Sequence, residues 1–300
     1  MKFLCGMLMT LCVLLLTGCG KSPSAADSSL LAAAGVPPVA YLAERIAGVP
    51  VISILPEGRS PHDFTPRPAD IRRAAGAKVF LSAGMPFEAA AAKSLAAGHV
   101  AVADVTKSVE RIPLEAHEHG HEHAHDREAE EHHHRGGEMD PHVWMSPANA
   151  CKIAESICEA LSLANPGQKE VYVQNCARLT EELIRLDGEI RRNLAGCQGR
   201  TFFVYHSAFG YFAEAYGLRQ ESVELGGREP SPSRLAEVSR EARKHKVKTI
   251  FVQPQFNPAA SQALARAIGG STAELDPLQR DLSASFRRIA EALSEGFSAR

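Results

Sequence analysis

The sequence of 300 residues predicts an α/β protein made of two Rossmann-like β/α lobes joined by one long rigid helix. Short runs of β-forming residues alternate with helical stretches in the first half of the chain, and the same alternation returns after residue 200. Between the two series lies one long helical pattern. Repeated β–α units form mostly parallel sheets with helices on both faces. We therefore expect two such sheets in lobes 30–166 and 197–300, with the linking helix within 167–196.

The first lobe begins with an alanine-rich apolar run and contains four short β-type runs. The expected strands are 30–34, 49–55, 78–81 and 99–105, and the expected helices are 39–47, 68–75 and 87–97. A turn-rich segment over 56–62 separates the second strand from the second helix. Ser146 and Pro147 then start another helix, with serine as the N-cap and proline in the first turn, and this helix runs to about residue 163.

The long helical pattern extends from about Gln168 to Leu194. Its apolar residues are spaced mostly by three or four and include Val171, Leu179, Leu183, Leu186, Ile190 and Leu194. A helix of this length would measure roughly 40 Å, which exceeds what one small lobe needs. In the second lobe we expect strands over 201–205, 222–225, 249–252 and 272–275, and helices over 208–216, 233–245, 258–268 and 280–297.

The first residues resemble an export signal. Lys2 is followed by an apolar run from Met7 to Leu16, which is too short to span a bilayer. Leu16-Thr17-Gly18-Cys19 resembles a bacterial lipobox, which implies a signal peptide over 1–18, lipidation of Cys19 and a polar tether over 19–29. An ordinary signal peptide with a chance cysteine is the alternative. We expect an exported, periplasmic or cell-surface protein anchored to the membrane through this lipid.

Composition excludes one class of partner and leaves the cysteines open. The formal net charge of −2 offers no electrostatic basis for binding nucleic acid. Beyond Cys19, the chain has Cys151, Cys158, Cys176 and Cys197, without Cys-x-x-Cys spacing. An exported protein permits disulfides. Four cysteines allow three complete pairings, and the sequence does not choose among these pairings and free thiols.

A histidine-rich tract within residues 115–138 indicates metal binding. Its imidazoles are His117, His119, His121, His123, His125, His132, His133 and His134. Neutral imidazole is a common metal ligand, so a loop of this composition can hold zinc-like cations weakly. A solvated linker without a role in metal binding is the alternative interpretation.

Four further residues are placed where α/β sheets bind ligands, at the carboxyl ends of predicted strands. His62 follows the second strand and His142 follows the loop that leaves the fourth. His206 and Asp276 directly follow strands of the second lobe. Three imidazoles and one carboxylate form a set that tetrahedral Zn²⁺ favours, so we expect one zinc site in the cleft between the lobes. Glu57 is a rival oxygen ligand.

The segments around these residues resemble a known family. The four segments are Pro56–Phe64 followed by Pro66-Arg67-Pro68, Asp140–Pro147, Tyr205–Phe212 and Leu275–Leu278. They are similar, in the same order, to the metal loops of the cluster A-I substrate-binding proteins of ABC importers. The resemblance covers nearly the whole chain after the signal. It implies two α/β lobes with one metal between them, and delivery of that metal to a cognate permease and its ATPase by a monomeric binding protein.

The third ligand position indicates the zinc branch of this family. Manganese-binding relatives usually have glutamate where this chain has His206, and an N₃O ligand set shifts the preference from manganese towards zinc. Arg59, Ser207 and Gln253 depart from the residues that the family often has, which bears on the hydrogen bonds around the ligands. We expect a binding protein and not an enzyme. The alternatives are a manganese-preferring relative, a zinc-buffering or adhesive surface lipoprotein and, more remotely, a zinc hydrolase.

Overall fold

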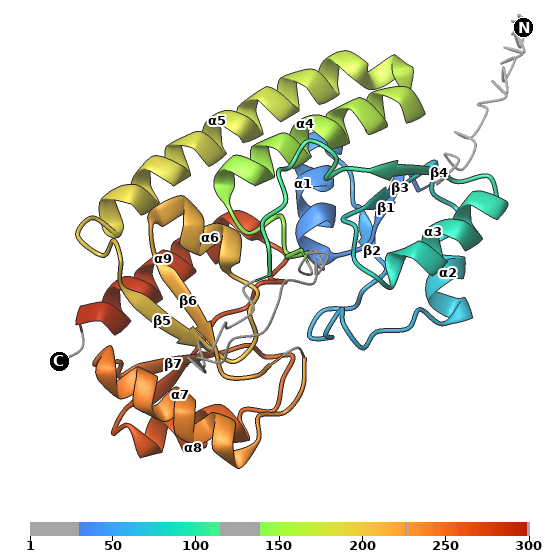
Figure 1. Ribbon diagram of the computed structural model, residues 1–300. Coiled ribbons are helices and arrows are strands. Elements are labelled where there is room, and N and C mark those ends of the chain that lie inside the picture. Colours follow the sequence, from blue (N-terminus) through green and yellow to red (C-terminus); the bar gives the residue numbers. More distant parts are fainter. Residues whose placement is uncertain (1–29, 115–138, 226, 299–300) are drawn as a thin grey trace, which may run out of the picture.

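The computed structural model describes residues 30–114, 139–225 and 227–298, and it confirms the predicted fold class of two parallel-sheet α/β lobes (Figure 1). The signal peptide, Cys19, the tether and the histidine-rich tract lie outside the described residues. Within the described part, no helix is both long and apolar enough to cross a bilayer.

The first lobe contains a parallel sheet with the strand order β2-β1-β3-β4. Its strands are β1 (Ala32–Ala34), β2 (Ile52–Ser53), β3 (Val79–Ser82) and β4 (Ala101–Asp104), and its helices are α1 (Pro37–Ala47), α2 (Pro68–Ala74) and α3 (Glu88–Ala97). In the register, Ala33 lies opposite Ile52 on one side and Phe80 on the other. The central strand β1 is small and fully buried because α1 packs closely against it.

The second lobe repeats this topology, with the strand order β6-β5-β7-β8. Its strands are β5 (Thr201–Val204), β6 (Arg219–Ser222), β7 (Thr249–Val252) and β8 (Ser271–Glu274), and its helices are α6 (Gly210–Tyr216), α7 (Pro232–Lys244), α8 (Ala259–Ala267) and α9 (Leu282–Ser298). In both sheets the strand that comes first in the chain is central. His62 and His206 follow β2 and β5 at their carboxyl ends, the edge at which such sheets bind ligands.

Two predicted strands differ from the structure. The second strand of the first lobe is restricted to Ile52–Ser53, although the nitrogens of Ile54 and Leu55 still donate to the carbonyls of Ala34 and Gly35 at 2.9 and 3.0 Å. In the second lobe, β6 begins three residues before the predicted segment 222–225, and Leu225 is exposed in a separate bridge with Arg228. The buried residues of β6, Gln220 and Ser222, are polar, so a search for apolar runs does not detect this strand.

The linking segment is a pair of antiparallel helices, α4 (Pro147–Ala164) and α5 (Lys169–Asn193), connected by a short 3₁₀ turn. The 25 residues of α5 make a helix of about 37 Å. Its buried stripe consists of Tyr172, Cys176, Leu179, Leu183, Leu186 and Ile190. The prediction of the buried residues differs from the structure at the start of the helix, where Tyr172 is buried and Val171 is exposed. This stripe packs on α4, α1 and α9, so α5 lies along both lobes (Figure 1).

Contacts between the lobes supplement this helix. The indole nitrogen of Trp144 donates to the carbonyl oxygen of Pro277 at 2.8 Å, and Trp144 is fully buried. The Arg280 side chain donates to the carbonyl of Val51 at 2.7 Å and forms an ion pair with Glu44 at 2.8 Å. These contacts join the two lobes directly, in addition to α5.

Candidate metal centre

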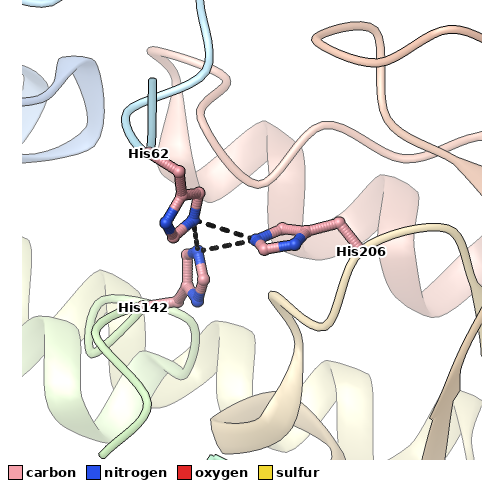
Figure 2. A group of neighbouring side chains, drawn as sticks. All are labelled: His62, His142 and His206. Atoms are coloured by element: carbon pink, nitrogen blue, oxygen red, sulfur yellow. Dashed lines mark hydrogen bonds between the residues drawn. The ribbon is translucent and has the colours of Figure 1, made fainter. Parts of the chain in front are cut away.

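Three predicted ligand residues meet in the space between the lobes. The Nε2 atom of His206 lies 3.0 Å from that of His62 and 3.4 Å from that of His142, and the last two are 3.2 Å apart. Figure 2 shows the three rings pointing towards one another from three separate segments. Two nitrogens bound tetrahedrally to one Zn²⁺ at 2.0–2.1 Å are about 3.3–3.4 Å apart. The triangle therefore has the dimensions that one ion requires.

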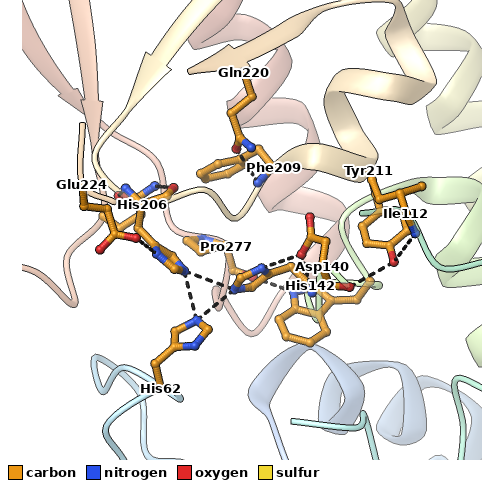
Figure 3. A network of polar contacts seen from close by, with 12 residues as sticks. His62, Ile112, Asp140, His142, His206, Phe209, Tyr211, Gln220, Glu224 and Pro277 are labelled. Atoms are coloured by element: carbon orange, nitrogen blue, oxygen red, sulfur yellow. Dashed lines mark hydrogen bonds and ion pairs between the residues drawn. The ribbon is translucent and has the colours of Figure 1, made fainter. Parts of the chain in front are cut away.

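His142 is oriented by the turn that precedes α4. Asp140 Oδ1 accepts hydrogen bonds from the backbone nitrogen and from Nδ1 of His142, both at 2.8 Å. Asp140 is itself buried, and its carbonyl accepts from the Tyr211 hydroxyl at 3.0 Å (Figure 3). A Cβ on Gly210 would lie 2.6 Å from Asp140 Oδ2, so the start of α6 approaches this carboxylate closely because residue 210 is glycine.

His206 is held in a similar way by two side chains of the second lobe. Its Nδ1 lies 2.6 Å from Glu224 Oε1. Gln253 binds the backbone of His206 in both directions, since its Oε1 accepts from the nitrogen at 3.1 Å and its Nε2 donates to the carbonyl at 2.9 Å. Because β5 ends at Val204, His206 follows a fixed strand directly, and the ring of Phe256 packs 5.0 Å from its own.

These partners determine which nitrogen is free. A neutral imidazole that donates its Nδ1 proton to a carboxylate has a lone pair on Nε2. His142 and His206 both have such a partner, so their lone pairs face the third ring (Figure 3). A single proton on His62 Nε2 cannot satisfy both lone pairs fully, whereas a cation among the three nitrogens can accept a lone pair from each ring.

The protonation of the rings is also suited to a cation. Desolvation, together with the positive charge that His206 and His142 would carry when protonated, lowers the pKa of His62 to about 3. His62 as a whole residue is exposed, but its ring tip lies within the group. Burial likewise lowers the pKa of His206, although the hydrogen bond that its Nδ1 donates to Glu224 raises it. Both rings are therefore neutral at pH 7, the state in which imidazole binds metal.

A cavity of about 680 Å³ opens beside the three nitrogens and is lined by residues of both lobes. Ser60, Asp63 and Leu114 belong to its first-lobe wall, and Ser207, Glu224 and Phe256 to its second-lobe wall. The site thus has access from the surface.

A family model described as zinc-uptake complex component A, periplasmic, matches residues 33–295. This chain belongs to the ZnuA family. The high-affinity zinc uptake system protein ZnuA of Yersinia pestis is 31% identical over 258 residues, which cover 80% of each chain. The zinc-binding lipoprotein AdcA of Streptococcus pneumoniae is 30% identical over 286 residues, covering 93% of this chain and 56% of AdcA.

Solved structures of ZnuA proteins show the same fold. A crystal structure of ZnuA superposes with a TM-score of 0.78 at 26% identity, covering 89% of this chain and 99% of that one. A zinc-bound deletion mutant of ZnuA superposes with a TM-score of 0.79 at 27% identity, covering 91% and 99%. The expected zinc-branch membership is therefore confirmed.

The two predicted carboxylate ligands of this ZnuA-family chain lie outside the triangle. Among the described residues, the group whose ligand atoms all lie within 4.8 Å of one another contains His62, His142 and His206 alone. Asp276 Oδ1 instead accepts from Gln255 Nε2 at 2.7 Å and from the nitrogen of Leu278 at 2.9 Å. Gln255 lines the cavity, so one side chain separates Asp276 from it. Glu57 is exposed. A fourth ligand from either residue stays a prediction.

The three residues that depart from the usual family pattern, Gln253, Ser207 and Arg59, have different positions relative to the ligands of this ZnuA-family site. Gln253 binds the backbone of His206 as donor and acceptor at once, which an ionised glutamate could not do. Ser207 lines the cavity, whereas Arg59 is exposed. The negative charge beside His206 comes from Glu224, which sequence reasoning missed together with Asp140. Asp140 could have been found from its spacing, since an aspartate two residues before a histidine can bind its backbone nitrogen.

Replacing Glu224 by glutamine is expected to weaken zinc binding roughly 10- to 100-fold, the usual effect of losing a partner of a metal ligand. The amide can still accept the Nδ1 proton, but the charge that increases the basicity of His206 is removed. Competition with a chromogenic chelator measures this change. Glu229→Gln is the matched control, because Glu229 is an exposed acid that lines the same cavity. An equal loss of zinc affinity in both variants would mean that the net charge of the cavity, and not the bond to His206, determines the affinity.

Proposed function

We propose that this chain is the extracytoplasmic zinc-binding component of a high-affinity ABC importer, which captures Zn²⁺ between its lobes and passes it to a membrane permease powered by an ATPase. The observation that carries the proposal is the triangle of Nε2 atoms with separations of 3.0–3.4 Å. The names of the relatives, a zinc uptake protein and a zinc-binding lipoprotein, support the choice of metal.

The donor set also favours zinc chemically. Three neutral imidazoles suit Zn²⁺ better than Mn²⁺, which prefers carboxylate, carbonyl and water oxygens. The fourth position is open to water, or to Asp276 if Gln255 releases it. A fourth protein ligand would make a closed site suited to carriage, whereas a water there is the arrangement of zinc hydrolases. The name of the relative ZnuA, a zinc uptake system protein, favours transport over hydrolysis.

We further propose that the protein acts as a monomer held to the membrane by a lipid on Cys19. The relative AdcA is described as a lipoprotein, which supports the anchor. Laminin-binding adhesins superpose at TM-scores of 0.75 and 0.73 with 23–24% identity, so they share the fold alone and do not favour an adhesive function.

Deleting residues 115–138 is expected to leave one tight zinc site and to remove weaker ones. The three ligands of the triangle lie outside this tract, and His142 and His206 are held by contacts of the described residues. Isothermal titration with zinc, followed by metal analysis after gel filtration, counts both classes of site. A matched variant that keeps the tract but carries His206→Ala should show the reverse result. Loss of all tight binding on deletion would contradict the proposed site.

A further inference from the structure

The helix pair α4–α5 contains three cysteines, Cys151 and Cys158 on α4 and Cys176 on α5. They are free thiols in the structure, as is Cys197. Cys158 and Cys176 are both buried, with 9% and 7% of their surfaces exposed. None of these cysteines has a part in the metal centre.

Two hydrogen bonds define how the antiparallel helices are aligned. The Cys151 thiol faces the carbonyl of Thr180 at 4.0 Å, and Asn165 Nδ2 donates to the Tyr172 hydroxyl at 3.0 Å. Cys158 is midway between residues 151 and 165, and Cys176 is midway between residues 180 and 172. The two cysteines therefore lie opposite each other across the helix interface, close enough that the Cys158 thiol raises the pKa of the Cys176 thiol.

We propose that Cys158 and Cys176 form a reversible disulfide that joins α4 to α5. The family is periplasmic, and that compartment permits disulfides. The oxidant is a small-molecule or protein disulfide. A protein thiolate attacks it and releases one thiolate of the oxidant. The second cysteine then attacks the mixed disulfide and releases the other. The oxidant gains two electrons and the two protein protons, and becomes two thiols.

The environment sets the rate of this reaction. Burial, together with the neighbouring Cys158, raises the pKa of the Cys176 thiol to about 12. Burial also raises the pKa of Cys151 to about 11. Thiolate is the attacking species, so oxidation of the folded protein is slow at pH 7 and faster at higher pH. Cys151 faces a backbone carbonyl and has no thiol opposite it in the described contacts.

The disulfide would link α5, which packs against both lobes, to α4, which follows the His142 segment. It closes a short loop of chain through the turn between α4 and α5. Such a crosslink restricts the unfolded chain and stabilises the native one. The zinc ligands are on other segments, so zinc affinity is unchanged by oxidation.

Incubation of the full-length protein with oxidised and reduced glutathione at pH 8, followed by non-reducing tryptic mapping, tests the proposal. Trypsin separates residues 153–169, which contain Cys158, from residues 170–178, which contain Cys176. We expect these two peptides to be linked, two thiols to be lost, and the melting temperature to rise by roughly 5–10 °C, reversibly with dithiothreitol.

Cys158→Ser should abolish the linked peptide and the rise in melting temperature, whereas Cys151→Ser, on the same helix, should keep both. Glutathione adducts at Cys158 or Cys176 without a linked peptide would overturn the proposal. A linkage through Cys151 or Cys197 would also overturn it. Mapping of the wild-type protein decides the matter even if a serine variant folds poorly.

Discussion

Replacing His62, His142 or His206 by alanine is expected to weaken zinc binding by at least about a hundredfold. Loss of a partner of a metal ligand costs 10- to 100-fold, and loss of the ligand itself costs at least as much. Each ring provides one corner of a triangle with edges of 3.0–3.4 Å, so none of them can be replaced by another. Chelator competition measures the dissociation constants of the three variants.

His245→Ala is the control, because His245 is at the end of α7, near Glu241 and away from the triangle. It should bind zinc as the wild type does.

The free energy of unfolding of each variant shows whether a loss of zinc binding comes from a loss of folding. His206→Ala leaves the buried Glu224 without its imidazole partner and should unfold more easily. His62→Ala removes an exposed residue and should fold normally. Tight zinc binding by the His62 variant would contradict the proposed ligand set.

Zinc-free protein is expected to lose stability as the pH falls from about 6.5 towards 3. An unfolded histidine takes up a proton near pH 6.5, whereas folded His62 does so near pH 3. Between these values the unfolded state binds more protons, so the free energy of unfolding decreases with decreasing pH. We expect a loss on the order of 1–2 kcal/mol, because solvent reaches His62 and screens the effect.

Urea unfolding with EDTA over a series of pH values measures this slope. In His62→Ala the slope between pH 6.5 and 4 should be reduced, since the group with the lowered pKa is absent. Zinc should raise the melting temperature at pH 7 by mass action. If the free energy of unfolding of the zinc-free wild type does not change over this pH range, the three imidazole rings do not lie close together without metal.

The sequence predicted the metal centre as far as strand ends could locate it. His206 was found because it follows β5 at once, and His62 and His142 because their loops leave the same edge of the first sheet. Asp276 follows β8 by the same rule, yet its side chain is bound by Gln255 and Leu278. The rule places a residue at the edge of a sheet, but local hydrogen bonds decide where its side chain points.

The residues that orient the ligands were harder to predict. Glu224 is two residues beyond β6, a polar edge strand whose position the apolar pattern missed by three residues. Without the correct strand end, nothing in the sequence placed this glutamate beside His206. Tertiary contacts such as the Tyr211–Asp140 bond join segments 71 residues apart and have no local signal.

The same Tyr211 contact, together with the Trp144–Pro277 bond, has a consequence for unloading. Both join the His142 segment to the opposite lobe, so a wide, hinge-like parting of the two halves would have to break buried bonds beside the metal. Unloading at the permease is therefore expected to begin at His62, the exposed ligand, while the buried His142 and His206 stay in place. Transfer would then proceed by exchanging ligands one at a time.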